Sequence, residues 1–117
     1  MKDFRTNFGD AYYSNLHDLS ESLSESLKYF NIENIYGVGG DYAVNLLAAF
    51  GDKFNMRPSS NEMHASFSAC GAAEVNGIGC CLTTYTVGSL PCISAAALAK
   101  TEGLPVIFIS GAPGESE

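Results

Sequence analysis

Residues 58–73 read PSSNEMHASFSACGAA, a polar turn that runs into a helix made almost entirely of small residues. A helix with so few bulky side chains lets another backbone, or a ligand, come very close. Glu62 stands in its first turn, where the helix dipole favours an acidic side chain. Ser59 and Glu62 also have the spacing of a capping box, in which both side chains satisfy free backbone N–H groups. The stretch therefore predicts a close-packed helix whose first acidic residue, Glu62, either caps the helix or has a functional role.

Upstream of this stretch, an apolar stripe predicts a long helix. Its members are three or four positions apart, at Leu16, Leu19, Leu23, Leu27 and Phe30. Ser14 is the predicted N-cap of this helix and Asn31 its predicted end. Residues 1–13 show no clear period, so we expect a lead-in arm there, followed by a domain over residues 14–117.

Strand-like and helix-like segments alternate along the rest of the chain. Strands are predicted at 32–38, 56–60, 79–85 and 105–110. Further helices are predicted at 43–50, 62–76 and 90–100. Asp41 and Ser89 are the predicted N-caps of the first and last of these. The order predicts an α/β fold in three α/β/α layers, with about four strands in a parallel sheet.

The edge of this sheet is the predicted place for a site. In open parallel sheets, ligands bind beyond the carboxyl ends of the strands, where loops lead into helices. The loops at 37–42, 59–62 and 83–90 carry polar and glycine residues. We therefore expect these three loops to meet and to form the functional site.

The glycines after the first predicted strand allow another interpretation. Residues 37–40 read GVGG, but the dinucleotide fingerprint G-x-G-x-x-G needs a glycine at position 42, where Tyr42 stands. A tight strand-to-helix turn capped by Asp41 explains these glycines better, and a nucleotide-dependent oxidoreductase is the weaker alternative. His64 is interpreted as a residue of the helix surface.

Composition and charge argue against several kinds of partner. A chain of 117 residues fits one domain, and its net charge of −7, with only six Lys and Arg, disfavours nucleic acid and anionic membranes. No signal peptide or membrane-spanning apolar run is visible. The cysteines at 70, 80, 81 and 92 lack metal-site spacing, and they predict buried thiols of a cytoplasmic protein. Cys80 and Cys81 are neighbours in a strand, so we expect them to face opposite sides of the sheet.

Four motifs, in one order and spacing, resemble a known domain. They read GVGGDY at 37–42, NEMHASFSACGAA at 61–73, TTYTVGSL at 83–90 and LPVIFISGAP at 104–113. Together they resemble the N-terminal pyrimidine-binding domain of thiamine-diphosphate-dependent enzymes, most closely its pyruvate and indolepyruvate decarboxylase branch. The resemblance covers residues 15–114.

This resemblance implies roles for individual residues. Glu62 corresponds to the acid that hydrogen-bonds N1′ of the cofactor's aminopyrimidine, which favours the tautomer whose exocyclic nitrogen takes the C2 proton. Asp41 corresponds to the aspartate that the decarboxylases use for proton transfer near the substrate. The other implied cofactor-binding residues are Gly40, Thr84, Val87 and Gly88.

The implied activity is the non-oxidative decarboxylation of a 2-oxo acid, a carbon–carbon lyase reaction through the C2 ylid of thiamine diphosphate. The resemblance implies that Mg²⁺ and the diphosphate are held by a second domain, of the same enzyme or of another subunit, and that this chain holds no metal. It also implies a homodimer or homotetramer for the complete enzyme. The family's sheet has six strands and its paired histidines would follow Pro113, so we expect a truncated domain that is inactive alone. The alternative is a truncated, non-catalytic binding or interaction module with the same fold.

Some positions depart from the decarboxylase pattern. Thr86 stands where that pattern has glycine, Ser89 where it has an acid, and Pro91 where it has a small residue. Gly39 replaces the usual proline of the turn before Asp41. These differences lie in the loops of the expected site and concern the fine geometry of substrate binding.

Overall fold

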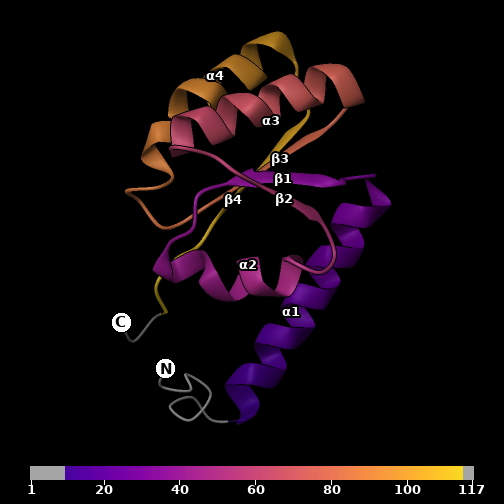
Figure 1. The fold of residues 1–117 in the computed structure, drawn as a ribbon, viewed down its shortest axis with the longest axis vertical. Helices are drawn as coiled ribbons and strands as arrows, with labels where there is room; N and C mark the ends of the chain where they lie inside the picture. Colours follow the sequence, from indigo (N-terminus) through magenta and orange to yellow (C-terminus); the bar gives the residue numbers. More distant parts are fainter. Residues whose placement is uncertain (1–9, 115–117) are drawn as a thin grey trace.

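The computed structural model describes residues 10–114, and in this range four parallel strands form one sheet (Figure 1). The strands are β1 (Asn34–Gly37), β2 (Asn55–Pro58), β3 (Gly79–Thr83) and β4 (Val106–Ser110). Their order across the sheet is β2-β1-β3-β4. The longest register joins β3 to β4, from Gly79 opposite Val106 to Thr83 opposite Ser110. The predicted four-stranded parallel sheet is confirmed.

Helices cover both faces of this sheet. They are α1 (Asp10–Tyr29), α2 (Val44–Phe50), α3 (Glu62–Asn76) and α4 (Ile93–Glu102). Two short 3₁₀ turns, η2 (Asp41–Ala43) and η3 (Leu90–Cys92), lead into α2 and α4. α1 and α2 lie on one face and α3 and α4 on the other, which confirms the three layers (Figure 1). Between residues 10 and 114, no helix is both long enough and apolar enough to cross a membrane.

The first helix begins earlier than the sequence pattern predicts. α1 begins at Asp10, so Ser14 lies inside the helix and is not its N-cap. Residues 10–13 read DAYY, with no glycine or proline to stop a helix and with an acid in the first turn. Of the predicted arm, residues 10–13 are thus helical and residues 1–9 lie outside the described range. Asn31 is confirmed as the end of the helix, since it adopts a left-handed φ of 60°.

Only part of the predicted apolar stripe of α1 is buried. Leu27 is 1% exposed and Leu23 packs against the core, whereas Leu19 and Phe30 are 62% and 52% exposed. The stripe therefore predicts the helix correctly but overstates how much of it the sheet covers.

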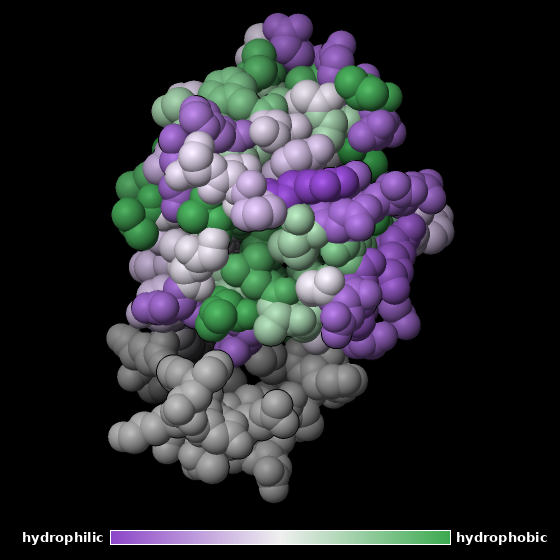
Figure 2. Space-filling view, in the orientation of Figure 1, coloured by the Kyte–Doolittle hydropathy of each residue, from purple (hydrophilic) through white to green (hydrophobic). Residues whose placement is uncertain are grey.

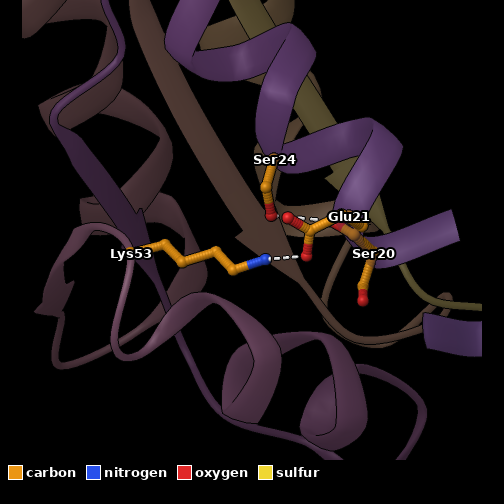
Figure 3. Close-up of polar contacts among 4 residues, drawn as sticks. All are labelled: Ser20, Glu21, Ser24 and Lys53. Carbon is orange, nitrogen blue, oxygen red and sulfur yellow. Dashed lines mark hydrogen bonds and ion pairs between the residues drawn. The ribbon is translucent and has the colours of Figure 1, made fainter. Parts of the chain in front are cut away.

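One ion pair joins the same helix to the segment before β2. Lys53 donates to the Glu21 carboxylate at 2.5 Å, as Figure 3 shows. Next to this pair and within α1, the buried Ser24 hydroxyl donates to the carbonyl oxygen of Ser20 at 2.6 Å. Because the Lys53–Glu21 pair is partly exposed, we expect it to contribute at most about 1 kcal/mol.

β3 is one of the two inner strands of the sheet, and all five of its residues are buried. Cys80 packs with Ile35 and Phe50 in the cluster under α1 and α2, whereas Cys81 packs with Ala65 of α3. The prediction that Cys80 and Cys81 face opposite sides is confirmed. Burial raises the pKa of the Cys80 thiol to about 12, so this side chain stays neutral at physiological pH.

The small residues of α3 bring its backbone close to β3. The residues that α3 buries are Ala65, Ser66, Ala69, Cys70 and Ala73. A Cβ added to Gly79 of β3 would overlap the carbonyl oxygen of Ala69. The predicted close packing is confirmed, and α3 ends as predicted at Asn76, with Gly77 at a φ of 86°.

Candidate functional site

Three loops meet at the carboxyl ends of the strands, at the left of Figure 1. They are residues 38–43 after β1, 59–61 after β2 and 84–89 after β3. Ser59 donates its backbone N–H to the carbonyl oxygen of Gly37 at 3.0 Å, and Gly111 donates to that of Thr83 at 3.0 Å. The first bond fixes the loop after β2 to the end of β1, and the second joins the residue after β4 to the end of β3. The predicted meeting of the loops is confirmed.

Glu62 is the first residue of α3, and its side chain is half-buried at this edge. The predicted capping box with Ser59 is wrong, because Asn61 is the N-cap. Its Oδ1 atom accepts the backbone N–H of His64 at 2.8 Å. Since Asn61 holds the extended conformation just before the helix, Glu62 is one residue past the cap and not three, too near to reach back. Its carboxylate makes no hydrogen bond or ion pair with the residues that the structure describes.

His64 lies on the surface of α3, as predicted. Its Nδ1 atom is 2.6 Å from the hydroxyl oxygen of Ser60. Together with the Asn61 cap, this contact fixes the polar turn that precedes Glu62. The turn places the Glu62 carboxylate at the start of the helix, and its side chains form no hydrogen bond with that carboxylate.

Asp41 begins η2 and its side chain is exposed. The prediction that it caps the following helix is wrong. Gly40 holds the N-cap position, and no side-chain hydrogen bond caps this turn. In the described part of the chain, the Asp41 carboxylate also has no hydrogen-bonding or ion-pair partner. The edge therefore carries two carboxylates, Glu62 and Asp41, that no described side chain engages.

Thr84 lies between two glycines of the site. A Cβ added to Gly40 would lie 2.5 Å from the Cβ atom of Thr84. A Cβ added to Gly88 would lie 2.9 Å from Cγ2 of the same threonine. The fold thus brings together Gly40, Thr84 and Gly88, three of the residues predicted to bind a cofactor. The two glycines pack so closely against Thr84 that any larger residue at either position would overlap it.

The loop after β3 exposes apolar side chains at this end of the molecule. Val87 is 76% exposed, and Tyr85 and Leu90 are also exposed. Figure 2 shows apolar surface at the left edge, where this loop lies in Figure 1. Val87, the fourth predicted cofactor-binding residue, therefore lies on the rim of the site and not inside it.

Thr86 is strained, and removing its side chain should stabilise the protein. It is a β-branched residue with a φ of 32°, a conformation that costs about 1–3 kcal/mol. Replacing it with glycine should raise the free energy of unfolding by about 1 kcal/mol, after the backbone entropy of glycine is subtracted. Chemical denaturation measures this. Val87→Gly is the control, since Val87 has no positive φ to relieve, and it should be destabilising by about 0.5–1 kcal/mol. A Thr86→Gly protein that is destabilised like the control would contradict the assignment of strain.

Sequence reasoning missed three residues of this edge. The rings of Tyr42 and Tyr85 meet edge to face, with centroids 5.9 Å apart, and join the turn after β1 to the loop after β3. Ser110, at the end of β4, donates its hydroxyl to the carbonyl oxygen of Thr84 at 3.1 Å. The sequence did place all three residues in loops or strand ends at this edge, which is the signal that could have marked them.

A hollow of about 520 Å³ lies at the opposite end of the sheet. It is lined mainly by polar residues around the amino ends of β1 and β2, among them Lys28, Glu33 and Asn55. A smaller apolar pocket of about 150 Å³ lies near the site, between Cys81, Cys92 and Phe108. Because parallel sheets bind ligands at the carboxyl ends of their strands, we assign the site to that edge and not to the larger hollow.

Comparison with known proteins identifies the family of this chain. Residues 17–117 match the family described as "Thiamine pyrophosphate enzyme, N-terminal TPP binding domain". The chain is 36% identical over 101 residues to pyruvate decarboxylase 3 of Arabidopsis thaliana. The aligned region covers 85% of this chain and 17% of that protein. It is 33% identical over 105 residues to pyruvate decarboxylase of Neurospora crassa, and this aligned region covers 85% of this chain and 18% of that protein.

A third relative carries a different description. The chain is 33% identical over 100 residues to the thiamine metabolism regulatory protein THI3 of Saccharomyces cerevisiae. The aligned region covers 84% of this chain and 16% of that protein. The chain therefore spans less than a fifth of the length of these three relatives.

Proposed function

The chain belongs to the thiamine pyrophosphate enzyme family, as an N-terminal TPP binding domain, and from this we propose that it forms the pyrimidine-binding side of a thiamine-diphosphate-dependent 2-oxo acid decarboxylase. The proposed domain is residues 14–117. The proposed reaction is the non-oxidative decarboxylation of a 2-oxo acid, a lyase reaction. Relatives described as pyruvate decarboxylases support this choice.

The observation that carries the proposal is the state of Glu62. Its side chain is half-buried at the carboxyl edge of the sheet, and its carboxylate has no partner within residues 10–114. A half-buried carboxyl gains from a hydrogen bond that replaces lost contact with water. We assign Glu62 to hydrogen-bond N1′ of the aminopyrimidine and to hold a proton there.

The other predicted site residues are assigned from their packing and their charge. Gly40 and Gly88 pack directly against Thr84, and a Cβ on either residue would displace this threonine. We assign these three residues, with Val87 on the rim, to the pyrimidine ring. Asp41 has an exposed carboxylate on the neighbouring turn, and we assign it to move protons on the substrate side.

When bound, thiamine diphosphate supplies the nucleophilic carbon and the electron sink that protein side chains lack. We propose that its diphosphate and Mg²⁺ are held by another domain of the same enzyme or by a second subunit. The length of the relatives supports this, since the chain matches less than a fifth of each.

A homodimer or homotetramer is proposed for the complete enzyme. A cytoplasmic location is proposed because the four cysteines are free and buried.

A second candidate is a non-catalytic module that keeps the fold and binds without turnover. One relative is described as a thiamine metabolism regulatory protein, which favours this candidate. Cofactor binding without decarboxylation by the complete protein would support it over the enzyme.

Calorimetry with thiamine diphosphate and Mg²⁺ tests the proposal in the complete enzyme. We expect the unaltered protein to bind and Gly40→Ala to weaken binding at least about tenfold, because the new Cβ meets Thr84. Gly39→Ala is the matched control, since its Cβ would approach only Leu47 Cδ1, at 3.9 Å, and its affinity should stay within about twofold. Absence of binding by the unaltered protein, or equal affinities of the two variants, would overturn the proposal. Thermal melting of both variants separates lost affinity from lost folding.

A further inference from the structure

Cys92 contacts both segments that carry the candidate site. It is the last residue of η3, and its side chain is 6% exposed. Its Sγ atom lies 3.6 Å from the carbonyl oxygen of Glu62 and 3.5 Å from that of Gly88. Glu62 begins α3 and Gly88 ends the loop around Thr84. One buried thiol therefore bridges two segments that are far apart in the sequence.

We propose that Cys92 is a positioning residue, whose thiol sets the spacing between the first turn of α3 and the loop after β3. Its consequence for cofactor binding rests on the function proposed above. The thiol donates to two backbone carbonyls and touches no reacting atom. It acts through Glu62 and Gly88.

The surroundings of Cys92 leave this task to its side chain. Its sulfur packs among small or apolar residues, Ala65, Ala69 and Cys81, which offer little to hold a carbonyl in place. Burial raises the pKa of Cys81, and the adjacent Cys92 thiol raises it further, so Cys81 stays a neutral packing partner. The Cys92 thiol is within donating distance of both carbonyls.

A shift at Cys92 has a direct route to Thr84. The backbone N–H of Cys92 donates to the carbonyl oxygen of Ser89 at 3.1 Å, and that of Gly88 donates to Tyr85 at 3.1 Å. These bonds make residues 85–92 a sequence of tight turns. Gly88 packs directly against Thr84, where an added Cβ would lie 2.9 Å from Cγ2. Loosening the thiol contact therefore loosens the loop that surrounds Thr84.

The chain contains a matched control for this thiol. Cys70 is also buried, at 3% exposed, and its Sγ donates to the carbonyl oxygen of Ala95 at 3.5 Å. That contact joins α3 to α4 away from Glu62. Cys70→Ala and Cys92→Ala both remove a buried thiol from the α3 side of the sheet. Only the second removes a contact to the site.

Two measurements test the proposal. In the cofactor-free protein, amide hydrogen exchange at residues 62–65 and 84–90 should be about tenfold faster in Cys92→Ala and unchanged in Cys70→Ala. In the complete enzyme, Cys92→Ala should weaken thiamine diphosphate binding by about tenfold, and Cys70→Ala by less than about twofold. Cys92→Ser should restore most of both properties, since its hydroxyl still donates.

The outcomes separate this inference from the proposed function. Equal exchange in the two alanine variants, or failure of serine to rescue either property, would overturn the role of Cys92. If the unaltered enzyme binds no thiamine diphosphate, the proposed function fails, and hydrogen exchange alone still decides whether Cys92 fixes the two segments.

Discussion

Replacing Glu62 with glutamine should slow exchange of the C2 proton of bound thiamine diphosphate by about 10²–10⁴-fold, because an amide cannot hold the proton at N1′. The experiment uses the complete enzyme and follows the C2 proton by nuclear magnetic resonance. The fold should be retained. The Glu62 carboxylate makes no hydrogen bond or ion pair with the described residues, so the main loss is its interaction with the helix dipole, about 0.3–1 kcal/mol.

Glu74→Gln is the control for this experiment. Glu74 lies in the same helix, exposed and three turns away from Glu62. Its replacement should leave the exchange rate unchanged. An unchanged rate in Glu62→Gln, with cofactor still bound, would refute the assignment of Glu62 to the pyrimidine.

Gly79→Ala should be among the most destabilising single substitutions in the chain. The new Cβ would overlap the carbonyl oxygen of Ala69, which is backbone and cannot rotate away. α3 would have to move off the sheet, so we expect the free energy of unfolding to fall by about 3 kcal/mol. Since α3 carries Glu62, cofactor affinity should fall as well. Chemical denaturation gives the first quantity and calorimetry the second.

Gly71→Ala is the matched substitution with the opposite sign. Gly71 lies in the middle of α3, and an added Cβ would meet no atom within 4 Å. Alanine in an open helical position should raise the free energy of unfolding by about 0.5–1 kcal/mol. A Gly79→Ala protein as stable as Gly71→Ala would mean that α3 does not approach β3 as closely as described.

The strands and their parallel arrangement follow from the sequence because each rests on a local pattern. The apolar run around Cys80 and Cys81 predicts a buried strand, and the small residues after Glu62 predict a closely packed helix. Helix caps were harder to predict. Asp41 and Ser59 have the right residue type, but a cap depends on which residue takes the extended conformation before the helix. The structure gives that conformation to Gly40 and Asn61.

The candidate site was predicted to the extent that it depends on topology. Glu62, Asp41 and Thr84 follow three different strands, and parallel strands bring such loops to one edge. The contacts across the site were not predictable in the same way. The Tyr42–Tyr85 pair and the Cys92 thiol join residues that are 30 or more positions apart, and no local pattern encodes which side chains will touch.

The strand order β2-β1-β3-β4 has a consequence for how function can change in this domain. After β1 the chain turns to the α2 face, and after β3 it turns to the α4 face (Figure 1). The two paths diverge between adjacent strands, and such a topological switch point is where parallel sheets bind ligands. This feature comes from the connectivity of the backbone and not from any carboxylate. Under the proposed function, a descendant that lost Glu62 would keep the switch point and lose only the proton, so a single substitution would separate a catalyst of this fold from a receptor for the same ligand.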